Sequence, residues 1–477
     1  MDRAKSTEIT NEKNNMDMFT KKWSMIVVIT ILITGSIFRI FLYGDLRLSI
    51  GTMDSIAYIN SSRVPLLSWE MFTGPRLFTT NLVYKMANDE SCGEPVISMP
   101  AAGEEKIRVI QPCFGKIAVL QNVLSILLWC IFAWVFAAKL TSHFAKILSA
   151  IVILAFAFMP QIAEWDSVLG SESLTFSLFA LSLAILLEIL SRTVKEGGQI
   201  QRGTKIWIAI YLIVFTLWVL VRDVNLSAVV VTLGMIIILL TFRACRRAKY
   251  LLVISFTLIT LLLIGIISTK QSPRLTYTLR HSFESRIFPY PARVDFFKSF
   301  GMPDPSSPDY ADWHEKKAST TYMLFLASHP RFVALTMFEY LDYFTDAHLQ
   351  PYYISPELPY RNTLITVGEF LHSKTSSVYL LDTIFFLVLC LAAIKRRQPR
   401  TYAWLWFTAW IYLVSGVSLF LNFFGDVSGS LRHIFPAVAT FRLSVWLFML
   451  IFIDEMLGRK EDINESTAKK SSNNSNE

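Results

Sequence analysis

The first membrane segment reads WSMIVVITILITGSIFRIFLY, residues 23–43, and it directly follows Lys21 and Lys22. A helix of about 20 apolar residues crosses the hydrocarbon core of a bilayer. This segment contains one charged residue, Arg39. It is too long for the apolar part of a signal peptide and lacks a small-residue cleavage site before Asp45, so we expect the chain to retain it. The stretch therefore predicts the first of several membrane-spanning helices.

The rest of the chain holds nine similar apolar runs. They cover residues 116–138, 146–163, 171–190, 206–221, 227–242, 250–268, 377–394, 402–422 and 434–454. Hydrophobic residues make up 53% of the 477 residues and charged residues 17%, whereas an average soluble protein carries about 25% charged residues. This composition excludes disordered, collagen-like, coiled-coil and disulfide-dense secreted proteins. The sequence predicts an all-α polytopic membrane protein with about ten transmembrane helices.

The basic residues are distributed unevenly between the two sets of short loops. The segments 139–147, 191–205, 243–249 and 395–400 hold 14 Lys or Arg residues, whereas the turns 163–170, 222–226 and 423–433 hold Arg222 and Arg432. Positively charged loops stay in the cytoplasm, so both termini are predicted to be cytoplasmic. The net charge of +8 is therefore read as a signal of sidedness, and no nucleic-acid partner is expected.

This sidedness divides the chain into five parts. Residues 1–22 and 455–477 are predicted to be disordered cytoplasmic tails, because they are polar. Residues 23–268 would form spans one to seven with an outer loop at 44–115, and residues 377–454 would form spans eight to ten. Residues 269–376 would be an outer helical segment. Residues 55–72 and 325–344 have the pattern of amphipathic helices lying in the membrane interface.

Acidic residues gather at the predicted outer ends of the spans. Asp54 follows the first span, and either a catalytic role or an N-cap of the next helix would explain it. Asp45 is the alternative acid in this loop. Asp166 and Glu172 lie in the turn before the fourth span, where capping by a serine and favourable interaction with the helix dipole are the simpler reading.

Basic residues gather at the same predicted face. Arg222, Arg432, His433 and Arg442 would form an outer cluster, and guanidinium groups pair well with phosphate. The alternative is an internal salt-bridge network. Its acidic members would be Asp166, Asp223 and Asp426. Arg39, near the outer end of the first span, is expected to snorkel to the membrane surface.

Cys92 and Cys113 both lie in the first outer loop. In an oxidising compartment they would form a disulfide worth about 3 kcal/mol, and two free thiols are the alternative. The sequence contains no Walker loop, HExxH motif, nucleophile elbow or pair of cysteines at zinc spacing.

The order and sidedness of several short motifs resemble a known family. These motifs are the first-loop acid at 53–58, WDxxxxSESL at 165–174, RDxN at 222–225, HP at 329–330 and the arginine–proline turn at 432–436. The chain resembles the C-type (GT-C) multi-span glycosyltransferase superfamily. It is similar to protein O-mannosyltransferases and to the lipid A aminoarabinose transferase, over most of residues 20–455.

The resemblance implies transfer of a hexosyl or pentosyl group from a polyprenyl-phosphate carrier to an acceptor hydroxyl, with inversion, on the outer face of the membrane. Asp54 would be the general base, because the attacking hydroxyl must lose a proton. The other roles are carried by two sets of residues. Asp166, Glu172 and Tyr58 would bind the acceptor or the sugar, and Arg432, His433, Arg222, Arg442 and Lys85 would bind the donor phosphate.

No metal ligand is predicted, although a divalent cation stays open as a cofactor. The acceptor would be a lipid, glycan or protein, and membrane lipids would surround the enzyme. A bacterial inner membrane is preferred to the endoplasmic reticulum. The alternative functions are a polysaccharide polymerase or ligase that uses a lipid-linked sugar, and a lipid or solute transporter.

Overall fold

The computed structural model describes residues 2–87, 89, 91–97, 110–197, 200–241, 249–272, 274–353, 360–425 and 430–474. Of residues 2–21, 275, 430 and 458–474 only the backbone is described. Asp426 and Cys245 lie outside these ranges.

Long helices dominate the described residues, and nine of them are long and apolar enough to cross a membrane. Ten elements contribute to the membrane region: α1 (Asp2–Tyr43), α5 (Gly115–Lys139), α6 (His143–Phe158), α8 (Glu172–Lys195), α9 (Arg202–Val219), α10 (Leu226–Thr241), α12 (Lys249–Lys270), α20 (Ser377–Arg396), α21 (Pro399–Gly425) and α22 (Ser430–Asn474). The protein is thus an all-α polytopic membrane protein, as the apolar runs predict.

One further apolar helix pair is bent and forms either a broken span or a re-entrant loop. Helix α6 ends at Phe158, and the chain continues after a 48° bend through α7 (Pro160–Ala163) and the 3-10 turn η1 (Glu164–Ser167). Met159 has an extended backbone, with φ −72° and ψ 155°, as expected of a residue that precedes proline. The bend turns the acidic segment that follows toward the rest of the bundle.

The described backbone of both tails continues as helix, and the disorder expected of the tails stays a prediction. Helix α1 begins at Asp2 and α22 ends at Asn474. Neither tail contains proline, and residues 1–22 contain no glycine. Adding residues to an existing helix requires no new nucleation step, so a polar continuation of a membrane helix forms more readily than an isolated helix.

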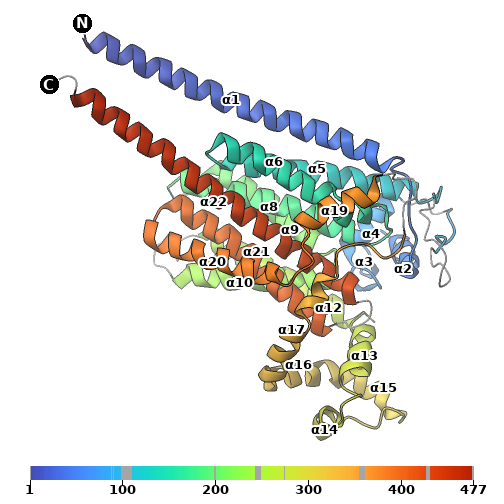
Figure 1. The fold of residues 1–477 in the computed structure, drawn as a ribbon. Helices are drawn as coiled ribbons and strands as arrows, with labels where there is room; N and C mark the ends of the chain where they lie inside the picture. The colour runs from blue at the N-terminus through green and yellow to red at the C-terminus, as the bar shows by residue number, and fades with distance from the viewer. Residues whose placement is uncertain are drawn as a thin grey trace.

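The two chain termini lie at the same end of the bundle (Figure 1), in keeping with an even number of spans. At the opposite end lie the short helices of the first loop, α2 (Met53–Ser62), α3 (Glu70–Thr73) and α4 (Phe78–Ala87). Which end faces the cytoplasm stays a prediction from the loop charges.

Helices α22 and α8 are the most buried of the spans and α1 lies at the periphery. In the most apolar window of each helix, 78% of α22, 67% of α8 and 11% of α1 is buried inside the protein. The ring of Trp410 packs against Phe179 and Trp218, with centroid distances of 6.0 and 6.1 Å. Because lipid is as apolar as these side chains, close packing of this kind holds membrane helices together. The packing fixes the position of the N-terminus of α8, where Glu172 lies.

The first loop is pinned to the turn before α8 by backbone hydrogen bonds. The amide of Ile50 donates to the carbonyl of Ser167 at 2.8 Å, and the amide of Leu169 donates to the carbonyl of Ile50 at 2.9 Å. Gly51 lies where the backbone approaches closely, since a Cβ there would be 2.5 Å from the carbonyl oxygen of Val96. These contacts bring the start of α2 next to the start of α8.

The segment after α12 projects from the bundle as a group of short helices (Figure 1). They are α13 (Arg274–Arg286), α14 (Pro291–Ser299), α15 (Asp309–Trp313), η3 (His314–Ala318), α16 (Ser319–Ser328), α17 (Pro330–Glu339) and α18 (Leu341–Thr345). Their apolar core is continuous with Phe423 and Phe424 of α21. The guanidinium of Arg286 lies over the ring of Phe423 at 3.8 Å. Helix α19 (Arg361–Leu371) then returns to the bundle.

The two amphipathic stretches predicted from the sequence are not single helices. Residues 55–72 are interrupted between α2 and α3, where Pro65 lies, and residues 325–344 are broken at Pro330. Proline removes the backbone donor that a helix interior requires. In addition, α2 buries Tyr58 and Ile59 together with three serines against the protein, so its packed face is part apolar and part polar.

Candidate active site

Asp54 lies in the first turn of α2. The N-cap of this helix is Thr52, whose amide donates to Ser55 Oγ at 2.8 Å. The alternative reading of Asp54 as the N-cap is therefore wrong, because the cap is two residues earlier. The Asp54 side chain is 41% exposed, so its carboxylate is accessible to a ligand from outside.

Arg432, at the start of α22, joins two carboxylates. Its Nη1 lies 2.5 Å from Asp54 Oδ2, and its Nε lies 2.6 Å from Glu172 Oε1. A second contact runs from Nη2 to Glu172 Oε2 at 3.3 Å. Only 1% of the Glu172 side chain is exposed. Arg432 thus links the first loop, α8 and α22 through one guanidinium group.

Gly170 makes room for this arrangement. A Cβ at this position would lie 2.5 Å from Glu172 Oε2 and 3.3 Å from Arg432 Nη2. Ser171 stands at the N-cap position of α8 but makes no capping hydrogen bond with its side chain, so the predicted serine cap is absent. Glu172 lies in the first turn of α8, where it is favourable to the helix dipole and also contacts Arg432. The absence of a side chain at 170 allows both.

Arg76 is the second cation on Asp54, and the sequence analysis missed it. Its Nη2 lies 2.9 Å from Asp54 Oδ1, and its guanidinium lies 4.2 Å from the ring centre of Tyr58. Arg76 follows Gly74 and Pro75 between α3 and α4. A search of the first outer loop for arginine as well as lysine would have found it.

Arg222 and His433 complete the basic side of the cluster. Arg222 Nη2 lies 2.9 Å from His433 Nδ1, and Arg222 Nη1 lies 3.8 Å from Glu172 Oε1. Arg222 precedes the 3-10 turn η2 (Asp223–Asn225). The predicted meeting of Arg222, Arg432 and His433 with acidic residues is therefore present in the structure.

Two tyrosines border the cluster. Tyr58 donates a hydrogen bond to Ser171 Oγ at 3.0 Å, and the Arg432 guanidinium lies 5.5 Å from the ring centre of Tyr352. Burial raises the pKa of Tyr352 to about 12. The Tyr352 hydroxyl therefore keeps its proton at neutral pH and can donate a hydrogen bond.

The charge balance at Asp54 favours the carboxylate. Burial alone would raise the pKa of Asp54, but the nearby charges of Arg432 and Arg76 outweigh it, and the pKa is lowered from its ordinary value. Asp54 is therefore ionised at neutral pH.

Asp166, another predicted site residue, has its partner outside the cluster. Asp166 forms a buried ion pair with Arg39 and accepts a hydrogen bond from Ser173. The expectation that Arg39 snorkels is wrong, because only 1% of its side chain is exposed. Asp166 therefore pairs with Arg39 and not with the arginines of the basic cluster, as the internal salt-bridge alternative would require.

Arg442 does not join the cluster. Its three guanidinium nitrogens donate to the carbonyls of Ser373, Ala347 and Thr345 at 2.7–2.9 Å. It therefore ties α22 to the chain around α18 and α19. Lys85 Nζ contacts the carbonyl of Ser62 at 3.5 Å.

Two further acids, Asp45 and Asp223, pair with arginines outside the cluster. Asp45 pairs with the exposed Arg47 at 2.7 Å. Asp223 pairs with Arg274 at 2.8 Å. The described contacts thus place Asp54, and not Asp45, beside the basic cluster.

A disulfide joins Cys92 and Cys113, as the spacing within one outer loop predicts. Arg63 donates to the carbonyl of Gly93 at 3.1 Å, so the disulfide-bonded loop is also tied to the end of α2.

The described residues contain no group of three or more His, Cys, Asp or Glu side chains that could hold a metal ion. Asp54 and Glu172 are instead both paired with Arg432. A cation between these two carboxylates would have to displace that guanidinium, so we derive no step through a metal.

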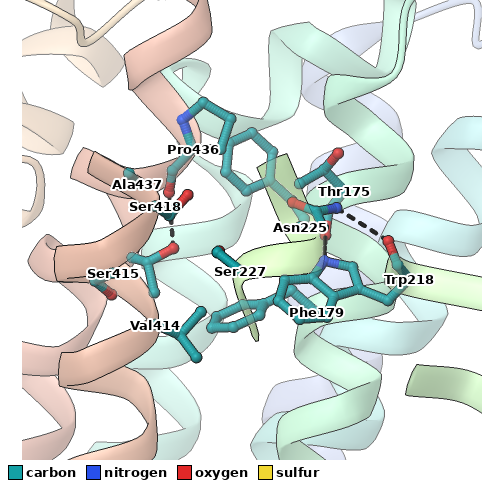
Figure 2. A pocket seen from close by; sticks show the side chains of 12 residues that line it. Thr175, Phe179, Trp218, Asn225, Ser227, Val414, Ser415, Ser418, Pro436 and Ala437 are labelled. Atoms are coloured by element: carbon teal, nitrogen blue, oxygen red, sulfur yellow. Dashed lines mark hydrogen bonds between the residues drawn. The ribbon is translucent and has the colours of Figure 1, made fainter. Parts of the chain in front are cut away.

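A small cavity lies between α8, α9, α10, α21 and α22 (Figure 2). Phe176 and Ala437 line it, four residues after Glu172 and His433 respectively. Its volume of about 20 Å³ holds about one or two water molecules. Ser227 Oγ, also in the lining, is buried and has no hydrogen-bond partner among the described residues. The cavity is thus suited to water and too small for a sugar.

Comparisons with known proteins give only distant likeness. No family model matches the chain, and no curated protein matches it. Among solved structures, the chain is similar to the archaeal oligosaccharyltransferase AglB from Archaeoglobus fulgidus in complex with an inhibitory peptide and a dolichol-phosphate. The identity is 13% and the TM-score 0.40, over 94% of this chain and 52% of that one.

The Archaeoglobus fulgidus oligosaccharyltransferase in complex with Zn and sulfate gives 13% identity and a TM-score of 0.43, over 90% of this chain and 50% of that one. The chain therefore spans about half the length of these structures. The functional argument below rests on the geometry of the site.

Proposed function

We propose that this protein is an integral membrane glycosyltransferase of the C type, which moves a sugar from a polyprenyl-phosphate carrier to an acceptor hydroxyl. The observation that carries the proposal is the set of guanidinium groups around an exposed carboxylate. Arg432 and Arg76 both contact Asp54. Arg222 lies 3.8 Å from Glu172, the second acid that Arg432 contacts.

The chemistry of the transfer needs these two kinds of group. The acceptor hydroxyl forms a bond to the anomeric carbon while the bond from that carbon to the phosphate oxygen breaks. Asp54 takes the hydroxyl proton, and the lipid phosphate leaves with the bonding electrons. A single displacement of this kind inverts the anomeric centre.

The arginines stabilise the leaving group. Negative charge grows on the phosphate as its bond to the sugar breaks, and fixed donors in a desolvated site lower the energy of that state. Arg432 is well suited because the buried Glu172 holds its Nε and Nη2, which fixes the plane of the guanidinium. Tyr352, at the border of the cluster, would contact the sugar or the acceptor. Tyr58 is buried, its hydroxyl donates to Ser171 and its ring lies under Arg76, so it would act by positioning Arg76.

The location of the cluster is in keeping with a lipid-linked donor. Glu172 and Arg432 lie at the first residues of two membrane-spanning helices, and Asp54 lies in a loop helix beside them. A polyprenyl chain in the bilayer would bring its phosphate to this depth.

The proposal is tested with purified protein in nanodiscs, a synthetic short-chain prenyl-phosphate sugar and mass spectrometry of the products. Asp54→Asn removes the base, so turnover should fall about 10²–10⁴-fold. Asp45→Asn, which alters an exposed acid paired with Arg47, should leave turnover unchanged and is the matched control.

Retained turnover in the Asp54→Asn protein would exclude the role assigned to this residue. A lengthened lipid-linked polymer as the product would favour a polymerase. Accumulation of substrate in sealed vesicles without any covalent product would favour a transporter.

A further inference from the structure

We infer that Asp54 occupies the phosphate site in the free enzyme, so that the donor phosphate must take Arg432 and Arg76 from this carboxylate when it binds. This inference rests on the proposed function and adds an order to it. The phosphate would bind first and release the base, and the acceptor would follow.

The two oxygens of Asp54 are held by different arginines. Oδ1 lies 2.9 Å from Arg76 Nη2, and Oδ2 lies 2.5 Å from Arg432 Nη1. These two arginines come from distant parts of the chain, the first loop and the start of α22. A carboxylate bridging two guanidinium groups makes the contacts that two oxygens of a phosphate would make.

The two acids of the cluster differ in how easily a ligand can displace them. Glu172 has 1% of its side chain exposed and contacts Arg432 through two nitrogens. Asp54 has 41% of its side chain exposed and contacts Arg432 through Nη1. An incoming anion can therefore replace Asp54 and leave Glu172 holding the guanidinium in place.

The described part of the cluster also has donors to spare. Arg76 Nε and Arg222 Nη1 are buried, and neither has a hydrogen-bond partner within the described residues. Three guanidinium groups face two carboxylates here. The local excess of positive charge favours a bound anion.

Displacement of Asp54 would also prepare it for catalysis. While both arginines contact the carboxylate, they stabilise its charged form and weaken it as a base. A phosphate that takes over the two guanidinium groups removes this stabilisation. The proton acceptor would become effective only once the donor is in place.

The test compares the affinity of farnesyl phosphate for four proteins in nanodiscs, measured by calorimetry: the wild type, two Asp54 variants and one control variant. Asp54→Asn removes the charge that competes for the arginines, so we expect about tenfold tighter binding than wild type, together with loss of sugar transfer. Asp54→Ala should behave in the same way, because it leaves no side chain on the two arginines.

Asp223→Asn is the control for general electrostatics, because it removes a nearby negative charge that is paired with Arg274. We expect its affinity to stay within about twofold of wild type. Asp223 is partly exposed and pairs with Arg274, so solvent and salt screen its charge from the arginines that contact Asp54. Equal tightening in this variant would show an effect of overall charge and would overturn the competition.

Equal or weaker binding by both Asp54 variants would overturn the inference, while sugar transfer by the wild type would leave the proposed function standing. If the wild type neither bound farnesyl phosphate nor transferred sugar, both proposals would fail.

Discussion

Arg432 is shared by two carboxylates that serve different purposes. Glu172 is buried and orients the guanidinium, whereas Asp54 is partly exposed and can be reached by a ligand from outside. Arg76 approaches Asp54 from the first loop, so the ionisation of Asp54 is governed by two cations that come from opposite ends of the sequence. The pH dependence of the reaction should report this pairing.

The prediction for Arg76 concerns the acidic limb of the pH profile. Burial raises the pKa of Asp54, and the charges of Arg432 and Arg76 lower it. Arg76→Gln removes one of the two lowering charges, so the pKa of Asp54 should rise. The pH below which kcat/KM falls should move upward by the same amount, because this limb reports the base of the free enzyme.

The measurement is kcat/KM between pH 4 and 8 on the nanodisc protein. Arg47→Gln, which removes an exposed partner of Asp45, should leave the limb in place. An acidic limb that does not move in the Arg76→Gln protein would contradict the pairing.

At the scale of elements, the site depends on how closely the start of α8 approaches the start of α22. Gly170 lies at this approach and has no Cβ to separate Glu172 from Arg432. Helix α1, by contrast, is largely exposed on its outer face, and its pair with the turn before α8 is buried. The approach of α8 to α22 can therefore be tested at Gly170, and the placement of α1 at Arg39.

Gly170→Ala should lower activity at least about tenfold and leave the fold intact. The new methyl would lie 2.5 Å from Glu172 Oε2, so Glu172 must move and Arg432 with it, and misplaced catalytic groups lose rate steeply. Gly416→Ala in α21 is the matched control, because its Cβ would meet only Phe441 Cζ at 3.9 Å among the described residues. Equal activity of the two variants would show that the approach at 170 is not required.

Arg39→Leu should destabilise the protein by about 3–5 kcal/mol, because it leaves Asp166 buried without its counter-charge. Both side chains are at most 2% exposed, so solvent screens the pair little. Chemical unfolding in detergent measures the loss. The double variant with Asp166→Leu should recover part of the stability, and wild-type stability of the single variant would contradict the role of the pair.

At the scale of the whole molecule, the sequence predicts the bundle well and the site in part. A helix needs about 20 apolar residues to cross the bilayer, so the apolar helices are predictable from the sequence. This includes the helix pair that bends at Pro160. Asp54, Glu172, Arg222 and Arg432 stand out because charged residues are few at the predicted outer ends of such runs.

The partners of these charges were not predictable to the same degree. Arg442 and Arg432 are ten residues apart on one helix, yet the first binds backbone carbonyls and the second binds two acids. Which partner each charge meets depends on the packing of helices that are distant in sequence, and periodicity carries no information about it. Arg76 was missed for the same reason, since its contact with Asp54 depends on the path of the chain between α2 and α4.

Transfer of a sugar from a lipid phosphate is proposed to depend on Asp54 with Arg76 and Arg432. It is tested most directly by mass spectrometry of lipid-linked sugars and surface glycans from cells that carry the wild-type gene, no gene, or the Asp54→Asn gene. In cells without the gene, we expect the prenyl-phosphate sugar to accumulate and one glycan to lack a sugar. Cells with the Asp54→Asn gene should give the same result. Identical glycans in all three strains, or full complementation by Asp54→Asn, would contradict it.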